Sequence, residues 1–385
     1  MTHRTVVGVE PPARWTSPVR PRRVLIAGGG IAGVEALMAL ADLGDRRLDV
    51  ALIAPREVFL LRPQMVGEPW GGPVLRVDLA RLCASFGATF RRASLTAVEP
   101  EGHVAMTSAG PRHFEELIVA TGAVASVPYS GVHVLGFGHL PDLLGEEGAG
   151  DVAIIVPPAT TWTLPAYELA VLVASGSHRR VRVLTPEHAP LEVFGHGPAA
   201  AVAHLLADHE IEVELGRTPA ADGDAAELAA VVVTLPRLDG PRLGGLAHDA
   251  QGFLRVDDGL AVLGADDVHA AGDVIAGPIK QGGLAAQQAE AATVAIVRRA
   301  GGRPPHAPYA PVLRGKLTAA DGSALYLRRK LDGLDAGEHR TSALWTTPGV
   351  VCAKRLARWL AARHPELDDG MTLDHVARAV VPGAS

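Results

Sequence analysis

Residues 22–40 read "RRVLIAGGGIAGVEALMAL": a short apolar run, three consecutive glycines, and then apolar residues at helical spacing. The run "RVLIAGG" predicts a strand that ends in glycines. The segment "IAGVEALMALADLG" predicts a helix that ends near Gly44, and "LDVALIA" predicts a second strand. A strand, a helix and a strand in this order are typical of a β-α-β unit in a parallel sheet.

The glycines at the turn of this unit stand as Gly28-x-Gly30-x-x-Gly33. The first allows a tight turn, the second lets the backbone approach a pyrophosphate, and the third lets the helix lie close to the sheet. Ile31 and Ala32 then begin the helix, whose positive end faces the anion. The pattern therefore predicts a dinucleotide-binding site.

The end of the second strand lacks the acidic residue that would usually bind the ribose hydroxyls, because Ala54 and Pro55 stand there. The ribose contact must then come from elsewhere. Arg56, Glu57 and Arg62 are the candidates, and each can equally be a solvated loop charge.

Length, charge and composition limit the class of protein. A chain of 385 residues with 48% apolar and 20% charged residues predicts two or three globular domains. The formal net charge of -6 argues against a nucleic-acid partner. The chain shows no apolar run of about 18 residues and no signal-peptide pattern at its start, which predicts a cytoplasmic protein. The richness in Arg, Ala and Gly suggests a bacterial genome of high GC content.

Two later segments carry further signals. Residues 115–123, "EELIVATGA", predict an apolar strand that ends at Ala120, Thr121 and Gly122. Residues 268–300 predict a strand that ends at Gly272-Asp273, followed by a loop and a long alanine-rich helix. Taken alone, the second segment could be a plain strand-to-helix turn and a packing helix of small residues.

Together with the first motif, these segments resemble the FAD-binding half of the pyridine nucleotide-disulfide oxidoreductase superfamily, over about residues 22–300. The resemblance implies that the cofactor is FAD and that Asp273 bonds the ribityl chain. The helix that begins near Gly283 would direct its positive end at the flavin pyrimidine edge. Implied FAD contacts are Gly28, Gly30, Ile31, Ala32, Gly33, Ala54, Arg56, Arg62, Leu95, Ala120, Thr121, Gly122, Gly272, Asp273, Lys280, Gln281, Gly283 and Leu284.

Members of this superfamily normally carry a second glycine-rich β-α-β unit that receives NADH or NADPH. Residues 151–176 keep a strand, Val152 to Val156, and a helix, about Pro165 to Ala174. The turn between them, Pro157 to Trp162, contains no glycine, and proline and bulky side chains prevent a close backbone approach. The second domain is therefore expected to keep its Rossmann-like fold without a conventional nicotinamide site, and Trp162, Tyr167 and Glu168 are expected to line a substrate pocket.

This departure, together with "VFLLRPQMVGEPWGG" (residues 58–72), resembles the branch that contains sulfide:quinone oxidoreductase, flavocytochrome c sulfide dehydrogenase and type II NADH dehydrogenase. In that branch a glutamate on the helix after the second turn lies toward the flavin, and Glu168 matches it by position. A helix-face carboxylate in water is the alternative. Sulfide oxidation there needs paired thiols, but Cys83 and Cys352 do not match the family's cysteines, and both are interpreted as buried apolar residues.

The loop "PIKQGGLAAQQ" (residues 278–288) supplies a second candidate catalytic residue, Lys280. Gly282 and Gly283 permit a close backbone approach, and Lys280 and Gln281 could donate hydrogen bonds to the flavin edge or to a bound acceptor. The alternative is that Lys280 caps a solvated loop. No metal site is expected, since the two cysteines form no CxxC or similar spacing.

The segment "GVVCAKRLARWLAARHPEL" (residues 349–367) predicts an amphipathic helix. A membrane-surface contact is one interpretation, and a cap on the flavin domain or a homodimer contact is the favoured one.

The sequence predicts an α/β protein with two Rossmann-like domains and a C-terminal extension. The expected parts are a mobile leader (1–21), an FAD-binding domain (22–127 and 251–305), a degenerate NAD(P)-binding-like domain (128–250) and a C-terminal region (306–385). The expected function is an FAD-dependent oxidoreductase that passes electrons between a small-molecule donor and an acceptor such as a quinone. The alternatives are an NAD(P)H-dependent flavoenzyme with unusual nicotinamide binding, and a flavin-binding scaffold without turnover.

Overall fold

The protein is described by a computed structural model covering residues 20–70, 74–136, 144, 150–177, 179–220, 225–305, 309–331, 333–345 and 353–364. Its largest sheet has six strands in the order β17-β18-β9-β1-β2-β5. These strands are β1 (Arg22–Ala27), β2 (Leu48–Ala54), β5 (Thr89–Arg92), β9 (Glu116–Val119), β17 (Ala261–Val262) and β18 (Ala265–Ala270). All neighbours run parallel except β17 and β18, so the carboxyl ends of β1, β2, β5, β9 and β18 lie at one edge.

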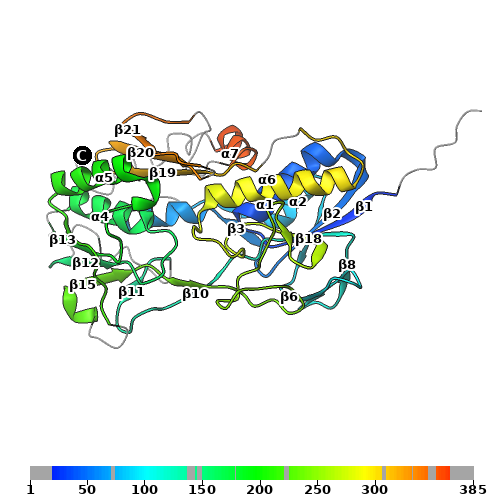
Figure 1. The fold of residues 1–385 in the computed structure, drawn as a ribbon, viewed down its shortest axis with the longest axis horizontal. Helices are drawn as coiled ribbons and strands as arrows, with labels where there is room; N and C mark the ends of the chain where they lie inside the picture. The colour runs from blue at the N-terminus through cyan, green and yellow to red at the C-terminus, as the bar shows by residue number, and fades with distance from the viewer. Residues whose placement is uncertain are drawn as a thin grey trace, which may run out of the picture.

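Helices α1 (Ile31–Gly44) and α6 (Gly282–Arg299) lie side by side across one face of this sheet (Figure 1). Their apolar side chains form one core with the strands, in which Ile26, Leu37 and Ile296 are fully buried. The strand, helix and strand predicted for residues 22–54 are confirmed.

Two glycines let α1 begin directly against the strand ends. Gly28 has φ +133°, and a Cβ atom at this position would lie 2.0 Å from the carbonyl oxygen of Ala120. A Cβ atom on Gly33 would lie 1.9 Å from the carbonyl oxygen of Gly28. Both distances are far below van der Waals contact, so any side chain at either position would displace α1 from the sheet.

A second sheet has five parallel strands in the order β11-β15-β12-β13-β14. Helices α4 (Leu164–Gly176) and α5 (His196–Asp208) pack on one face of it. The strand and the helix predicted within residues 151–176 are both present. Its strands are β11 (His133–Val134), β12 (Val152–Ile155), β13 (Val181–Leu184), β14 (Glu212–Glu214) and β15 (Val231–Thr234).

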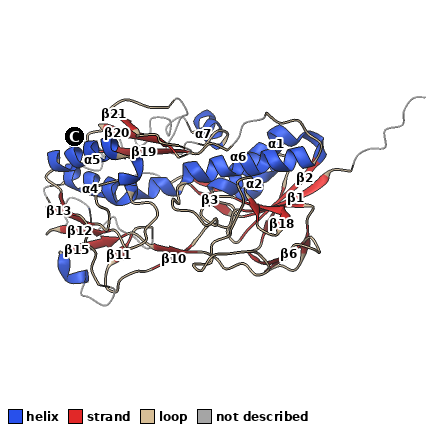
Figure 2. Cartoon of the chain, viewed as in Figure 1, coloured by secondary structure: helices blue, strands red, loops and turns tan. Residues whose placement is uncertain are grey.

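Two antiparallel strands connect the sheets: β10 (Val124–Ser126) leads out of the first sheet, and β16 (Arg237–Asp239) leads back. Figure 2 shows β10 between the two layered α/β units, and these two units confirm the predicted fold class. The smaller elements are β3 (Val58–Leu60), β4 (Arg76–Asp78), β6 (Leu95–Glu99), β7 (Val104–Thr107), β8 (Arg112–His113), α2 (Leu79–Ser85), η1 (Asp45–Arg47), η2 (Arg62–Trp70), η3 (Glu192–Phe194) and η4 (Ala225–Leu228).

The C-terminal region contains an antiparallel sheet that the sequence analysis did not predict. Its strands are β19 (Val312–Thr318), β20 (Ala324–Lys330) and β21 (Glu338–Arg340). Leu313, Leu317 and Leu327 are fully buried in the same core as α4 and α5. This sheet therefore covers the helices of the second sheet.

The final described helix, α7 (Leu356–Arg363), packs on α1 through buried Leu356 and Leu360. The backbone N–H groups of Arg355 and Leu356 donate to the fully buried carboxylate of Glu35 on α1, at 2.8 and 2.7 Å. Burial raises the pKa of Glu35 to about 7, although these two bonds oppose the increase. The apolar face of α7 thus lies against the first sheet's helices, which is the predicted cap.

Cys83 lies on α2 and is buried, as predicted, and burial raises the pKa of its thiol to about 11. Cys352 and residues 1–19 of the predicted leader lie outside the described residues. Within the described part of the chain, no helix is long and apolar enough to cross a membrane, and no group of three metal-ligating side chains is found.

The close contact at Gly33 predicts an asymmetric result for two glycine-to-alanine substitutions. Gly33→Ala should lower the free energy of unfolding by at least about 2 kcal/mol, because its Cβ would overlap the Gly28 carbonyl. Gly30→Ala is the matched control, because a Cβ there meets no atom within 4 Å, and it should cost under about 1 kcal/mol. Urea unfolding of both variants measures the difference, and equal losses would contradict the packing argument.

Candidate functional site

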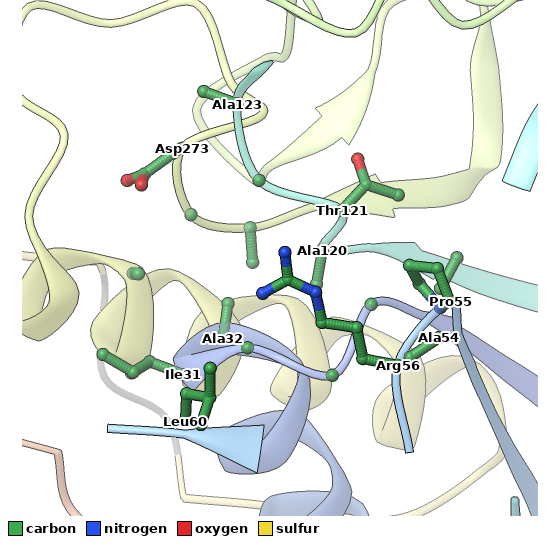
Figure 3. A pocket seen from close by; sticks show the side chains of 18 of the residues that line it. Ile31, Ala32, Ala54, Pro55, Arg56, Leu60, Ala120, Thr121, Ala123 and Asp273 are labelled. Carbon is green, nitrogen blue, oxygen red and sulfur yellow. The ribbon is translucent and has the colours of Figure 1, made fainter. Parts of the chain in front are cut away.

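The candidate site is a cavity of about 410 Å³ where the carboxyl ends of β1, β2, β9 and β18 meet the start of α1 (Figure 3). A ligand site at this edge is the rule for open parallel sheets. Predicted residues that line it are Gly28, Gly30, Ile31, Ala32, Ala54, Arg56, Arg62, Leu95, Ala120, Thr121, Gly122, Gly272 and Asp273. Gly282, where the sequence predicts a close backbone approach, also lines the cavity. Lining residues that were not predicted are Ala27, Gly29, Ile53, Pro55, Val58, Leu60, Leu79, Ala93, Ser94, Ala123, Ala125, Leu238, Ala271 and Ala285.

The N-terminus of α1 presents its backbone to the cavity. Gly30 is the N-cap residue and has no side chain to bond the first-turn amides, and the first intrahelical bond runs from Val34 N–H to the Gly30 carbonyl at 2.9 Å. The amides of Ile31 and Ala32 therefore have no intrahelical acceptor. A helix end of this kind binds anionic groups such as phosphate.

Two turns form the opposite wall. Gly122 has φ +75° and Gly272 has φ +84°, conformations that a residue with a side chain rarely adopts. The Gly272 N–H donates to the side chain of Gln288 on α6 at 2.8 Å, which fixes the turn before Asp273. The sequence around Gln288 does not predict this hydrogen bond, because its partner, Gly272, lies 16 residues away along the chain.

Asp273 is half-buried at the end of β18 and lines the cavity. Burial raises the pKa of its carboxyl group, while the positive charges of Lys280 and Arg62 lower it. The two cations therefore favour the charged form of the Asp273 carboxyl group, which burial disfavours. Arg56 and Arg62 add two guanidinium groups to the cavity lining.

Lys280 has its hydrogen-bond and ring partners inside the protein. Only 6% of its surface is exposed, so it does not cap a solvated loop, and it does not line the cavity. Its ammonium group donates to the Ile275 carbonyl and lies 3.9 Å from the centre of the Phe253 ring. Burial lowers the pKa of Lys280 to about 8, and Asp273 and Asp249 oppose this shift. Lys280 therefore acts on the cavity through the charge of Asp273.

Gln281 also has a structural partner at each end of its amide. Its Oε1 accepts from the Leu284 N–H at 2.8 Å and caps α6, and its Nε2 donates to the Arg314 carbonyl at 3.2 Å. One of the free N–H groups at the start of α6 is thus bonded by a side chain of the protein itself. Gly282 and Ala285 are the residues of α6 that line the cavity.

Four other predicted residues lie outside the cavity lining. Gly33 contacts Gly28, Gly283 lies against the Gln281 side chain, and Leu284 is buried in the core of the second sheet. Glu168 is half-buried on α4, where burial raises the pKa of its carboxyl group to about 8 and the Lys316 ammonium group opposes the increase. It therefore does not behave as a carboxylate in water.

In the second sheet, one carboxylate is bonded by three hydroxyl groups of the chain. Glu187 follows β13, and its carboxylate accepts from the hydroxyls of Tyr167 at 2.7 Å, Thr163 at 3.0 Å and Thr185 at 3.1 Å. Tyr167, expected to line a pocket, is instead fully buried. Trp162 packs beside the Phe194 ring, with 5.9 Å between ring centres.

No family model matches the chain. Two NADH dehydrogenase-like proteins from Mycobacterium tuberculosis strains are each 26% identical over 293 residues, which span 66% of this chain and 73% of theirs. The sulfide:quinone oxidoreductase structure from Aquifex aeolicus superposes with a TM-score of 0.71 at 16% identity, over 94% of this chain and 93% of that one. A ferredoxin reductase from Rhodopseudomonas palustris superposes with a TM-score of 0.62 at 15% identity, over 94% of this chain and 100% of that one.

These comparisons and the sheet topology agree on the fold. The chain has the fold of the FAD-dependent pyridine nucleotide-disulfide oxidoreductases, as its motifs predict. The likeness to the sulfide:quinone oxidoreductase extends over the C-terminal region, since almost the whole chain is covered.

The environment of Glu168 predicts a pH dependence of stability. Its pKa of about 8 in the folded state lies above the ordinary value of 4.5, so the folded protein binds one more proton between these values. The free energy of unfolding should therefore fall as the pH rises from about 5 to about 8. Glu168→Gln should reduce this fall by at least about 1 kcal/mol in urea unfolding at pH 5.5 and 8.5. Glu57→Gln, at an exposed carboxylate, is the control and should leave the fall unchanged.

Proposed function

We propose that the protein is an FAD-dependent oxidoreductase that holds FAD in the cavity at the start of α1. The observation that carries this proposal is the uncapped helix end at Gly30, with the Thr121-Gly122 turn and Asp273 facing it across one cavity. The backbone amides of α1 suit a pyrophosphate, and a carboxylate suits the hydroxyls of a ribityl chain. When bound, FAD supplies two-electron transfer at its N5 atom.

The protein's own groups fit such a cofactor along its length. The adenosine half would lie at the ends of β2 and β5, among Ala54, which ends β2, Arg56, and Ser94 and Leu95, which follow β5. Gly30 and Ala32 would hold the pyrophosphate. The remaining side of the cavity, formed by Asp273 and the start of α6, would receive the ribityl chain and the flavin ring.

Two features support an electron donor other than a conventionally bound NAD(P)H. The turn from Pro157 to Trp162 lacks glycine, and Ala159 within it has φ +60°. Glu187, where a ribose-binding carboxylate would stand, already accepts three hydroxyl groups of the chain. A ribose would have to displace these groups from a buried position.

Glu168, on α4, is the group proposed to hold or release a proton on the substrate side of the protein. With a pKa of about 8, it is protonated in the folded protein at neutral pH and can donate a proton to a reduced acceptor. The Lys316 charge lowers this pKa and so would ease the release of the proton.

The donor and the acceptor are proposed to be small molecules, with a quinone as a candidate acceptor because the Aquifex structure is a sulfide:quinone oxidoreductase. The usual sulfide route is not proposed, since Cys83 is a buried thiol with a pKa of about 11. We assign FAD binding to residues 22–127 and 251–305, supported by the six-stranded sheet, and the substrate side to residues 128–250.

A second candidate function is an NAD(P)H-dependent flavoenzyme with unusual nicotinamide binding. It is favoured by the names of the two mycobacterial relatives, which are NADH dehydrogenase-like proteins. The filled position at Glu187 argues against it.

The purified protein is expected to be yellow and to release FAD, rather than FMN, on heating. Chromatography of the released flavin measures this. Gly30→Val should abolish FAD binding while the protein stays folded, because the new side chain extends into the open space in front of α1 where the phosphates would lie. A colourless wild-type protein that takes up no added FAD would refute the proposed function.

The flavin is expected to be reduced slowly or not at all by NADH and NADPH, because the second sheet offers them no glycine turn and no free Glu187 carboxylate. Anaerobic stopped-flow absorbance of the FAD-loaded protein measures the rate. Rapid bleaching by micromolar NADH or NADPH would favour the second candidate function.

A further inference from the structure

Arg56 lines the cofactor cavity, as the sequence predicts. It follows Ala54 and Pro55 at the end of β2, where dinucleotide-binding units usually carry an acidic residue for the ribose hydroxyls. Figure 3 shows its side chain leaving the strand end and reaching into the cavity, toward the space between Ala32 and Thr121.

The guanidinium group of Arg56 has no carboxylate partner among the residues that the structure describes. Asp273, on the far wall, points away from it in Figure 3 and is influenced by Lys280 and Arg62 instead. The neighbouring Glu57 is exposed and does not line the cavity. The positive charge of Arg56 is therefore available to a ligand.

The chemistry of the two residue types gives opposite preferences at this position. A carboxylate accepts hydrogen bonds from ribose hydroxyls and repels a phosphate, whereas an arginine binds a phosphate oxygen pair through two parallel N–H donors. In related dinucleotide sites, an arginine near the second strand accommodates a phosphate on the adenosine ribose.

We propose that Arg56 makes the adenosine end of this cavity an anion site, which takes adenosine diphosphate nucleotides that carry a phosphomonoester on the ribose. Such nucleotides compete with FAD for the cavity. The inference rests on the proposed function, because it places the adenosine half of FAD at the end of β2. Arg56 is thus a specificity-determining residue of the cofactor site.

The test uses the FAD-loaded protein and two probes, ADP-ribose and 2′-phospho-ADP-ribose. FAD that leaves the protein is measured by its fluorescence at low and high KCl. We expect the 2′-phosphorylated probe to release half of the FAD at a concentration at least tenfold lower than ADP-ribose does. Because salt screens an exposed guanidinium group, the preference should shrink at high KCl.

Arg56→Gln should bring the two probes to within about twofold of each other, since it removes the charge and keeps the length of the side chain. Arg92→Gln is the matched control: its Nε donates to the Pro55 carbonyl at 3.2 Å and it does not line the cavity, so the preference should stay. Arg62→Gln should weaken FAD binding without changing the ratio between the probes.

Equal displacement by the two probes, or no displacement by the 2′-phosphorylated probe at millimolar concentration, would overturn the proposal. An unchanged preference in Arg56→Gln would do the same. If the purified protein contains no FAD, the proposed function fails, and calorimetry with the same two probes then tests the ribose-phosphate preference by itself.

Discussion

The cavity depends on the close packing of Gly28 against two other backbone segments, at Ala120 and at Gly33. The Ala120 carbonyl and the Gly33 position approach Gly28 so closely that neither Gly28 nor Gly33 has room for a Cβ atom. This packing brings the start of α1, the end of β1 and the turn after β9 together around one cavity. The anion-binding backbone, the guanidinium groups and Asp273 could not face one cavity if α1 lay farther from the sheet.

The sequence predicts the turns around this cavity well, because the backbone conformation at these turns requires glycine. Gly28, Gly122 and Gly272 all adopt positive φ, and each belongs to a motif that the sequence analysis identified. Ala125 and Leu238 were missed as lining residues because nothing in their local sequence marks them. They reach the cavity through β10 and β16, which pair with each other although they lie far apart along the chain.

The same limit applies to Gln281 and Lys280, whose side chains lie outside the cavity lining. Both stand in a loop that enters a helix beside the cavity, and both have donors that would suit a flavin edge. In the structure, Gln281 donates to the Arg314 carbonyl and Lys280 donates to the Ile275 carbonyl. Arg314 belongs to the C-terminal sheet, which was not predicted. Side-chain direction depends on such distant partners, whereas the backbone course of the loop follows from its own glycines.

The two sheets differ in how their strands are ordered along the chain. All five strands of the second sheet come from one continuous stretch, residues 133–234, so this sheet can complete its hydrogen bonds while the ribosome is still making the rest. The six-stranded sheet has to wait for β18, which pairs with β9 and is separated from it by the whole second sheet. Until then β9 has an open edge, and buried Glu35 lacks its partners for longer still, because Arg355 and Leu356 follow β18 along the chain. The cavity therefore cannot be completed before β18 and the start of α6 have been made, and β9 keeps an unpaired edge during that time.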